Sequence, residues 1–286
     1  MTHNTATPSA SRLLRAASWL WLFSIALAFS TPLQAAAPAR TLADIRSSGE
    51  VVIAVFSDRA PFDYVDHDGS WQGFNILYGN RIASDLGVRP RYVPVDPATR
   101  IEFLASAKAD IVLADFSITP ERSGQVDFAL PYMKASIGVI SPEDQVCRSL
   151  EALYSQTLIV TKGSITEQYF HTHHPRIRLL KYAHTADTYQ ALLDGRAAAL
   201  AADNTEVLAW ARGHPGFTVG IQSLGDTDLI AAAVQKGNRE LLAWLNDHIR
   251  SLGEERFFHR IFEQSLAPFY GADVEADTIV IEGGVY

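Results

Sequence analysis

The fold is decided by residues 110–122, which read Asp110-Ile-Val-Leu-Ala-Asp-Phe-Ser-Ile-Thr-Pro-Glu-Arg122. The first five residues are mostly apolar and rich in branched side chains, which is typical of a buried strand. Thr119 followed by Pro120 indicates a helix start, because threonine can cap the first turn and proline suits the first helical position. Arg122 is therefore expected on the first turn of a helix, close to the end of a strand.

Strand and helix patterns alternate on both sides of this stretch. Before it, strands are predicted at 50–56 and 91–95, and helices at 74–86 and at 100–107, the latter capped by Thr99. After it, strands are predicted at 156–161, 177–180 and 197–202, with helices opening at 163–167 and spanning 185–193. Two successive βαβ series predict an α/β fold in which helices cover parallel strands.

Two extended stretches are expected to join these series. Residues 133–141 have the pattern of a hinge strand, and residues 228–234 that of a strand returning to the first series. Helices at 239–252 and 254–264 would then pack on the first series. We predict two lobes joined by two hinge crossings, with lobe 1 formed by residues 38–136 and 231–286 and lobe 2 by residues 137–230. Ligands of open α/β sheets bind beyond the carboxyl ends of the strands, so we expect a ligand in the cleft between the lobes.

The first 37 residues are predicted to be a signal peptide. Arg12 and Arg15 form a short basic region, residues 16–30 are an apolar run, and small residues follow as far as Pro38. The alternative is an uncleaved membrane anchor, for which the run is short, since a span needs roughly 20 residues. No cysteine lies near the cleavage region, so we expect a soluble mature protein without a lipid anchor.

Charge and cysteine content exclude several classes of function. The net charge is −8, and residues 1–37 carry two arginines and no acid, so the mature part is near −10. A nucleic-acid surface needs a basic stripe, so we expect no nucleic-acid partner. Cys147 is the only cysteine and is interpreted as an ordinary free thiol. The stretch His171-Thr-His-His174 is interpreted as a solvated loop, because structural zinc sites normally need four ligands. We expect no metal, no cofactor and a monomer.

Arg122 and Asp203 are the candidate ligand-binding charges. An arginine fork matches a carboxylate, and exposed amides at a helix start favour the same anion. The alternative for Arg122 is a surface ion pair with Glu121 or Asp127. Asp203 ends the last strand of the predicted second lobe, where it could accept hydrogen bonds from an ammonium group, could cap the next helix, or could do both. Together the two residues would clamp a zwitterion.

A series of motifs extends over the mature chain. They are, in order, Asp68-Gly69 with Gly73-Phe74, Thr119-Pro-Glu-Arg122, Val126-Asp-Phe128 with Pro131-Tyr132, Lys162-Gly-Ser164, and Gly195-Arg196 through Asp203. In this combination the chain resembles the polar amino-acid class of extracellular solute-binding proteins, which feed ABC importers. Further motifs resemble the cysteine-binding members: Gln125-Val-Asp-Phe128, Leu130-Pro-Tyr-Met-Lys134, Asp203-Asn-Thr205 with Ala209-Trp210, His214-Pro215, and Val280-Ile-Glu-Gly-Gly284.

The resemblance implies a two-lobed type II periplasmic-binding-protein fold, a periplasmic location and a membrane permease as partner. The implied ligand is cysteine, cystine or a related small polar amino acid. Arg122 matches the residue that binds the α-carboxylate, and Asp203 matches the acid that binds the α-ammonium. Ser117 and Thr119 match hydrogen-bonding positions of the first lobe, and Ser164 a contact of the second. Phe62 and Phe116 complete the ligand-contacting set.

Three departures from the family pattern bear on selectivity. Ile165 replaces a hydroxyl residue and adds an apolar wall. Arg59 lies near the position of a common aromatic residue; it could favour an acidic side chain or thiolate, or point to solvent, and we favour solvent because lone charges usually lie outside. Asp115 could pair with Arg59 or accept from the ammonium. Asn75 replaces an acid common in the family, and we expect little effect on ligand choice.

The expected activity is binding without catalysis. The alternative is a cyclohexadienyl-type dehydratase on the same fold, which would need a positioned acid, and Glu167 is the nearest candidate. A ligand-sensing partner of a membrane receptor is a third reading.

Overall fold

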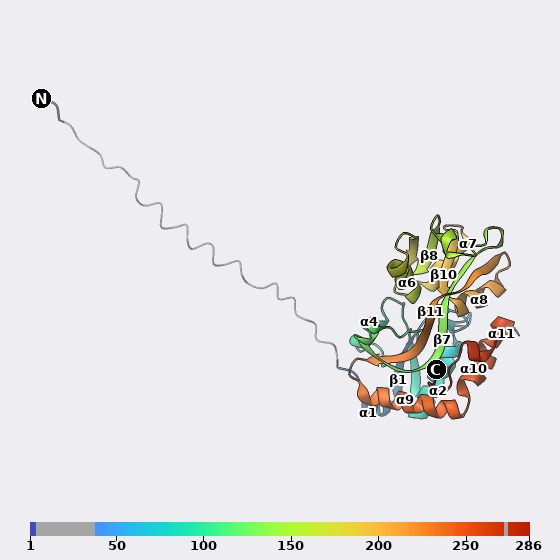
Figure 1. Ribbon diagram of the computed structural model, residues 1–286. Coiled ribbons are helices and arrows are strands. Elements are labelled where there is room, and N and C mark those ends of the chain that lie inside the picture. Colours follow the sequence, from blue (N-terminus) through green and yellow to red (C-terminus); the bar gives the residue numbers. More distant parts are fainter. Residues whose placement is uncertain (4–37, 272–273) are drawn as a thin grey trace. The chain divides into compact units, whose positions relative to one another are not determined.

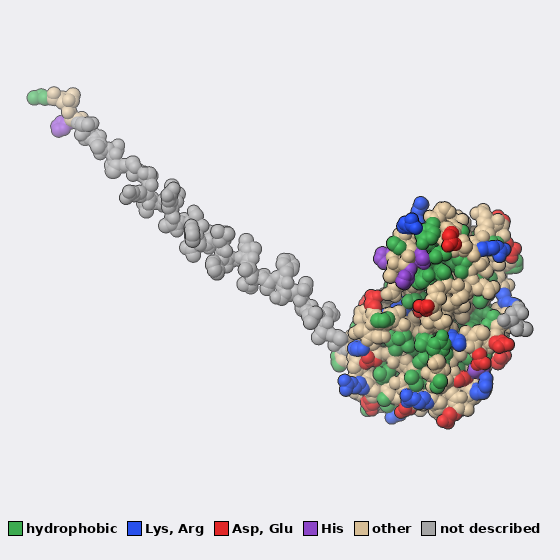
Figure 2. Space-filling view, in the orientation of Figure 1, with side chains coloured by type: hydrophobic (Ala, Val, Ile, Leu, Met, Phe, Trp, Pro, Cys, Tyr) green, Lys and Arg blue, Asp and Glu red, His purple; other side chains and the backbone are tan. Residues whose placement is uncertain are grey.

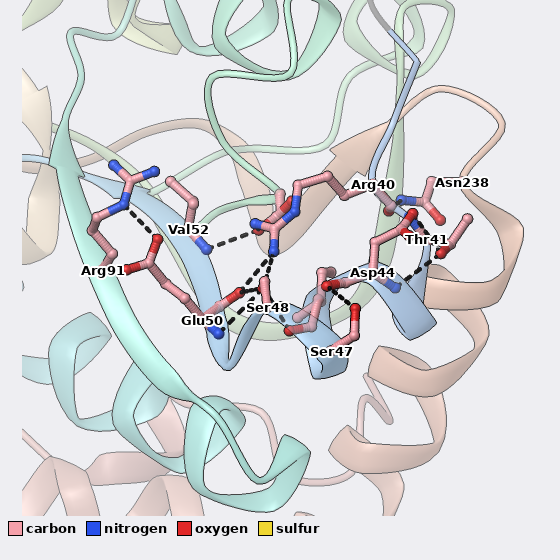
Figure 3. Close-up of polar contacts among 11 residues, drawn as sticks. Arg40, Thr41, Asp44, Ser47, Ser48, Glu50, Val52, Arg91 and Asn238 are labelled. Carbon is pink, nitrogen blue, oxygen red and sulfur yellow. Dashed lines mark hydrogen bonds and ion pairs between the residues drawn. The ribbon is translucent and has the colours of Figure 1, made fainter.

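The computed structural model describes residues 1–3, 38–271 and 274–286, and residues 36–286 form a unit separate from Met1–Ala35. The predicted signal peptide lies almost wholly outside the described residues. Figure 3 shows how the chain enters the unit ahead of helix α1 (Leu42–Ser48). Arg40 donates to the Asp110 carboxylate over 2.8 Å, and this carboxylate also accepts the Val52 backbone N–H over 2.8 Å. The beginning of the segment 38–271 is thus fixed to the residue just before the strand at Ile111 and, through it, to the strand that contains Val52.

An eight-stranded sheet is the centre of this unit (Figure 1). In spatial order its strands are β5 (Arg89–Pro94), β1 (Glu50–Val55), β6 (Ile111–Val112), β11 (Phe217–Gln235), β7 (Val126–Pro142), β10 (Ala199–Asp203), β8 (Thr157–Thr161) and β9 (Arg178–Tyr182). β1 pairs in parallel with β5 and β6, and β8 pairs in parallel with β9 and β10. The predicted α/β class with two parallel strand series is confirmed.

β7 and β11 form the two crossings between these series. They are antiparallel to each other, and their register shifts several times between Val219 and Ala233. β11 pairs with β6 at Ala233 and Val234, whereas β7 pairs with β10 at residues 137–140. Both strands are longer than the stretches predicted from sequence, because they continue through the bulges into both halves of the sheet. The predicted lobe boundaries remain a prediction.

Helices cover both halves of the sheet. Besides α1 they are α2 (Phe74–Leu86), α3 (Arg100–Ala105), α4 (Pro120–Ser123), α5 (Leu150–Leu153), α6 (Ile165–His173), α7 (Thr185–Leu193), α8 (Asn204–Gly213), α9 (Arg239–Glu254), α10 (Phe257–Ser265) and α11 (Ala267–Tyr270). A small antiparallel sheet of β2 (Asp58–Arg59), β3 (Asp63–Val65) and β4 (Trp71–Gln72) adjoins the first half. None of the helices in the described part of the chain is long and apolar enough to cross a membrane.

Separate apolar cores lie in the two halves. Residues of β1, α2, α9 and α10 share one core cluster, which includes Ile53, Ile82, Leu245 and Phe258. This packing confirms the expectation that the last long helices return to the first strand series. On the other side, Leu158, Val160 and Phe170 belong to one cluster and Ile159, Leu192 and Val207 to another.

Two local predictions were wrong. The Thr99 side chain does not cap α3; its Oγ1 bonds instead to the backbone of Asp96, because the chain turns before the helix. His171 and His173 lie in the last turn of α6 instead of in a loop, and Figure 2 shows histidine side chains gathered on the surface at this end of the unit. The polar character of this stretch reflects the exposed face of a helix.

Candidate ligand-binding site

A small cavity lies between the two halves of the unit. Its lining residues are Arg59, Pro97, Arg100, Asp115, Ser117, Ser164, Ile165 and Asp203. Asp115 and Ser117 follow β6, Ser164 follows β8, and Asp203 ends β10, so the cavity lies at the carboxyl ends of parallel strands. The structure thus brings together six of the ten residues predicted from sequence.

Arg122 lies beside this cavity on the first turn of α4. The Thr119 hydroxyl caps that helix by accepting the Arg122 backbone N–H over 3.2 Å. The buried guanidinium donates from Nη1 to the Ser117 carbonyl over 2.9 Å and from Nη2 to the Gly163 carbonyl over 3.1 Å. The surface-pair alternative is wrong, because Glu121 accepts from Gln168 and Asp127 pairs with Lys236.

Arg100 is a second buried cation that the sequence analysis missed. It donates to the carbonyls of Ala114 and Asp115 over 2.8 and 2.9 Å, and to the Gly163 carbonyl over 3.2 Å. Burial, with the nearby charges of Arg122 and Arg59, lowers the pKa of Arg100 well below its ordinary value. No motif in the sequence marks this residue, which lies in the first turn of an ordinary short helix.

Arg100 and Arg122 together make one wall of the site electropositive. Both guanidiniums lie over the Phe116 ring, with their central carbons 4.3 and 5.1 Å from its centroid. Within the described residues, both donate to carbonyl groups and neither forms an ion pair with a carboxylate. A buried cation without a carboxylate partner strongly favours an arriving anion.

Asp203 and Asp115 provide negative charge from the opposite lobes. Asp203 is the N-cap residue of α8, but its side chain makes no capping hydrogen bond, so the capping alternative is wrong for the carboxylate. Burial raises the pKa of Asp203 above its ordinary value. Asp115 accepts from the Asn75 amide over 3.0 Å, and Asn75 in turn accepts from the Tyr132 hydroxyl over 2.9 Å. Asn75 therefore holds a carboxylate that lines the cavity, a contact that its position at a helix start did not reveal.

Arg59 is buried, and the prediction that it points to solvent was wrong. Its Nη1 lies 3.2 Å from Asp115 Oδ2 and 3.6 Å from Asp203 Oδ2, and its Nε lies 3.1 Å from Glu206 Oε2. Burial alone would lower the pKa of Arg59, but its carboxylate neighbours, led by Glu206, raise it above its ordinary value. Glu206 was overlooked because an acid in a first helical turn is common on helix surfaces.

The remaining predicted residues have mixed positions. Ser164 lines the cavity, and its hydroxyl accepts the Glu167 backbone N–H over 3.0 Å as the cap of α6. Ile165 supplies an apolar part of the wall. Phe116 lies under the two arginines, whereas Phe62 is only 1% exposed and packs in the core of the first half. Phe62 therefore does not line the cavity.

Gly163 closes one edge of the cavity. Its φ of 74° is in the left-handed region, and a Cβ atom there would lie 2.5 Å from the Ala98 Cα of the opposite half. Further bonds across the cleft join Gln168 to Glu121 over 2.9 Å and the Ala186 N–H to Asp58 over 2.9 Å. The two halves are therefore in a closed arrangement around the cavity.

The fold and this charge pattern are those of a two-lobed solute-binding protein. Residues 51–267 match the family described as bacterial extracellular solute-binding proteins, family 3, and the chain belongs to this family. Curated relatives include amino-acid-binding proteins of ABC transporters. One curated relative is an enzyme, the cyclohexadienyl dehydratase of Pseudomonas aeruginosa, which is 29% identical over 199 residues, or 68% of this chain and 73% of the relative.

Two solved structures share the fold over nearly their whole length. The cysteine-binding protein from Campylobacter jejuni is 44% identical, with a TM-score of 0.83 and coverage of 84% of this chain and 98% of its own. The solute receptor for L-cysteine of Neisseria gonorrhoeae is 41% identical, with a TM-score of 0.84 and coverage of 85% and 100%. The family resemblance and the two-lobed periplasmic-binding-protein fold are confirmed.

Replacing Gly163 by alanine is expected to keep the lobes apart, because the new Cβ would overlap the Ala98 backbone. Small-angle X-ray scattering should then show a larger radius of gyration than for the unmodified protein. Gly195→Ala is the matched control, since Gly195 has a similar φ of 67° with nothing within 4 Å of the added atom. Equal radii for the unmodified protein and Gly163→Ala would contradict the closing role of Gly163.

Proposed function

We propose that this protein binds one small, free amino acid between its lobes and delivers it to the permease of an ABC importer, with cysteine as the preferred ligand. The observation that carries the proposal is the presence of buried charges of both signs at the cavity. Among the described residues, Arg100 in the cavity wall and Arg122 beside it have no carboxylate partner, and Asp203 and Asp115 line the same cavity. An α-amino acid has the complementary pair of charges, with its α-carboxylate placed at Arg122 and its α-ammonium at Asp203.

The lining of the cavity favours a short, uncharged side chain. Ile165 and Pro97 supply apolar surface, while Arg100 places in the wall a positive charge that only carbonyl groups compensate among the described residues. A lysine or arginine side chain would meet like charge there, which costs several kcal/mol. Cysteine fits these conditions, and the similarity to two cysteine-binding proteins supports it.

The surroundings of Arg59 also bear on the ionisation state of the thiol in a bound cysteine. Arg59 is compensated by Asp115, Asp203 and Glu206 and is not a free cation that would stabilise a thiolate. We therefore expect cysteine to bind with a neutral thiol. Cystine remains the second ligand to be compared, because the family resemblance implies either form.

We also propose that the protein is exported and works with a membrane permease. Residues 1–37 would be removed as a signal peptide, leaving a periplasmic monomer that contacts a membrane permease. The family of extracellular solute-binding proteins supports an extracytoplasmic location. The same protein could serve a membrane sensor, and the contact surface for either partner would be that of the closed form.

Dehydration of a cyclic acid is the second candidate function, raised by the dehydratase among the relatives. It would require Glu167 to donate a proton. Burial would raise the pKa of Glu167, but the Lys181 ammonium and the Gly163 N–H together lower it below its ordinary value. The Glu167 carboxylate is 2.7 Å from Lys181 Nζ and 2.6 Å from the Gly163 nitrogen. A carboxylate held in its ionised form in this way is a poor general acid.

Arg122→Ala should abolish amino-acid binding, because the ligand carboxylate would be buried without its partner. The expected loss is about 2–5 kcal/mol, or at least thirtyfold in Kd, measured by calorimetry. Arg122→Lys keeps the charge but loses the fork and should retain only part of the affinity. Arg196→Ala, which removes an exposed arginine paired with Asp194, is the control. Near-native affinity in Arg122→Ala would rule out the carboxylate role.

Cysteine should give the largest thermal shift in a panel of the twenty amino acids and cystine. The panel is run under reducing conditions, except for the cystine sample. Serine and alanine are expected to bind more weakly, and arginine and lysine to give no shift, because of the positive wall. A larger shift with arginine or glutamine than with cysteine would contradict the ligand assignment, and no shift with any amino acid would contradict the function.

Incubation with prephenate-like cyclic acids should give no product, because Glu167 is ionised near neutral pH. Product formation is followed by ultraviolet absorbance over the pH range 5 to 8. Glu167→Gln is compared in parallel. Steady turnover that disappears in Glu167→Gln would favour the enzyme over the binding protein.

A further inference from the structure

Arg59 and Glu206 connect the two halves of the unit inside the closed cleft. Arg59 is the last residue of β2, in the small sheet beside the first half. Glu206 lies in the first turn of α8, directly after β10 of the second half. The Nε and Oε2 atoms of the pair are 3.1 Å apart, and both side chains are at most 5% exposed. Ion pairs with this degree of burial are uncommon and need several partners to offset desolvation.

Arg59 also contacts the two carboxylates proposed for the ligand ammonium. The same Nη1 atom approaches Asp115 Oδ2 of the first half and Asp203 Oδ2 of the second. The aromatic ring of Phe56 lies under the guanidinium, 4.5 Å from its central carbon. The Phe56 ring of the first half thus packs against Arg59, and the Nε and Nη1 atoms of Arg59 contact carboxylates of the second half.

We propose that Arg59 and Glu206 form an ionic clasp across the cleft, which positions Asp115 and Asp203 for the ligand and makes lobe closure part of recognition. This inference rests on the proposed amino-acid-binding function. Arg59 is then a positioning residue: it acts on the ligand through the two aspartates. When the lobes separate, Arg59 keeps Asp115 but loses Asp203 and Glu206, so the ammonium site is complete only in the closed form.

The clasp gives closure a pH dependence through Glu206. Burial raises the pKa of Glu206 from 4.5 to about 7. The positive charge of Arg59 opposes this increase, and the negative charge of Asp203 adds to it. Tyr189, Tyr270 and Asp115 are the other titratable groups that face it. The pKa of Glu206 is higher in the closed form than in water, so protonation of Glu206 favours closure. This stabilisation of the closed form is lost as the pH rises through 7. Ligand affinity should therefore be higher at pH 5.5 than at pH 7.5, by a factor on the order of ten.

Four variants and calorimetry at these two pH values test the clasp. Arg59→Met leaves three buried carboxylates without their cation and should weaken cysteine binding at least thirtyfold at pH 7.5. Arg59→Lys keeps one charge and should recover part of that loss. Glu206→Ala removes the cross-lobe contact and should weaken binding about tenfold at pH 7.5. Glu206→Gln keeps the size of the side chain but stays uncharged, so at pH 7.5 it should bind cysteine about as tightly as the unmodified protein does at pH 5.5, and its affinity should change less with pH.

The comparison of Glu206→Gln with the unmodified protein isolates the Glu206 contribution. Asp228, whose pKa burial raises to about 6, and the His184–Asp96 pair across the cleft are present in both proteins. Arg81→Met is the matched control for loss of an arginine, since Arg81 pairs with Asp85 and Glu255 on the surface of the first half. It should lower thermal stability and leave the affinity and its pH dependence unchanged.

Two results would overturn the clasp: affinity within threefold of the unmodified protein in Arg59→Met, or an undiminished pH step in Glu206→Gln. Scattering in the absence of amino acids separates this failure from failure of the proposed function. If no amino acid binds, a larger radius of gyration in Arg59→Met than in Arg81→Met still supports the clasp, and equal radii contradict it.

Discussion

Three buried arginines determine how the two halves of this protein must meet. Arg59, Arg100 and Arg122 surround one cleft, and a guanidinium remains charged in a protein, so each must find partners for its N–H groups when water is removed. The first half supplies some of these partners, including the carbonyls of Ala114 and Ser117. From the second half, the Gly163 carbonyl accepts further hydrogen bonds, and the carboxylates of Asp203 and Glu206 supply opposite charge 3.6 and 3.1 Å from Arg59. Neither half can therefore bury this charge alone.

The distribution of partners creates a polar cavity. In the part of the chain that the structure describes, Arg59 pairs with the carboxylates, whereas Arg100 and Arg122 contact only carbonyl oxygens and the face of Phe116. Carbonyl dipoles and an aromatic face compensate a cation less than a carboxylate does, so positive potential persists at the Arg122 side. Negative potential persists where Asp115 and Asp203 share a single Nη1 atom. The closed form thus holds buried charges of both signs at one cavity, which suits the proposed amino-acid ligand.

Local signals in the sequence were sufficient for most of the fold. The bounds of α2 agree with the prediction, because its apolar spacing and the left-handed Gly87 that ends it are encoded within the helix itself. Thr119 and Pro120 likewise determine the start of α4 through their own backbone chemistry. Thr99 shows the limit of this reasoning, since Asp96 offers its hydroxyl a competing partner in the preceding turn. The motifs also selected most of the cavity residues, including Ser117, Ser164 and Asp203.

The residues that were missed or misplaced depend on contacts between distant segments. Arg59 alone resembles a solvent-exposed charge, and only the approach of Glu206 and Asp203 from the other half makes its burial favourable. Arg100 has no motif because its partners are backbone carbonyls, which carry no sequence signature. Yet each of these groups is attached to a well-packed element: Asp115 through Asn75 and Tyr132 to the first core, and α8 through the bond from the Tyr270 hydroxyl to the Thr205 carbonyl. Because both lobes are rigid, a small opening of the cleft separates Arg59 from Asp203 and Glu206 without deforming either core. The distances between these charged groups therefore depend directly on the relative position of the two lobes.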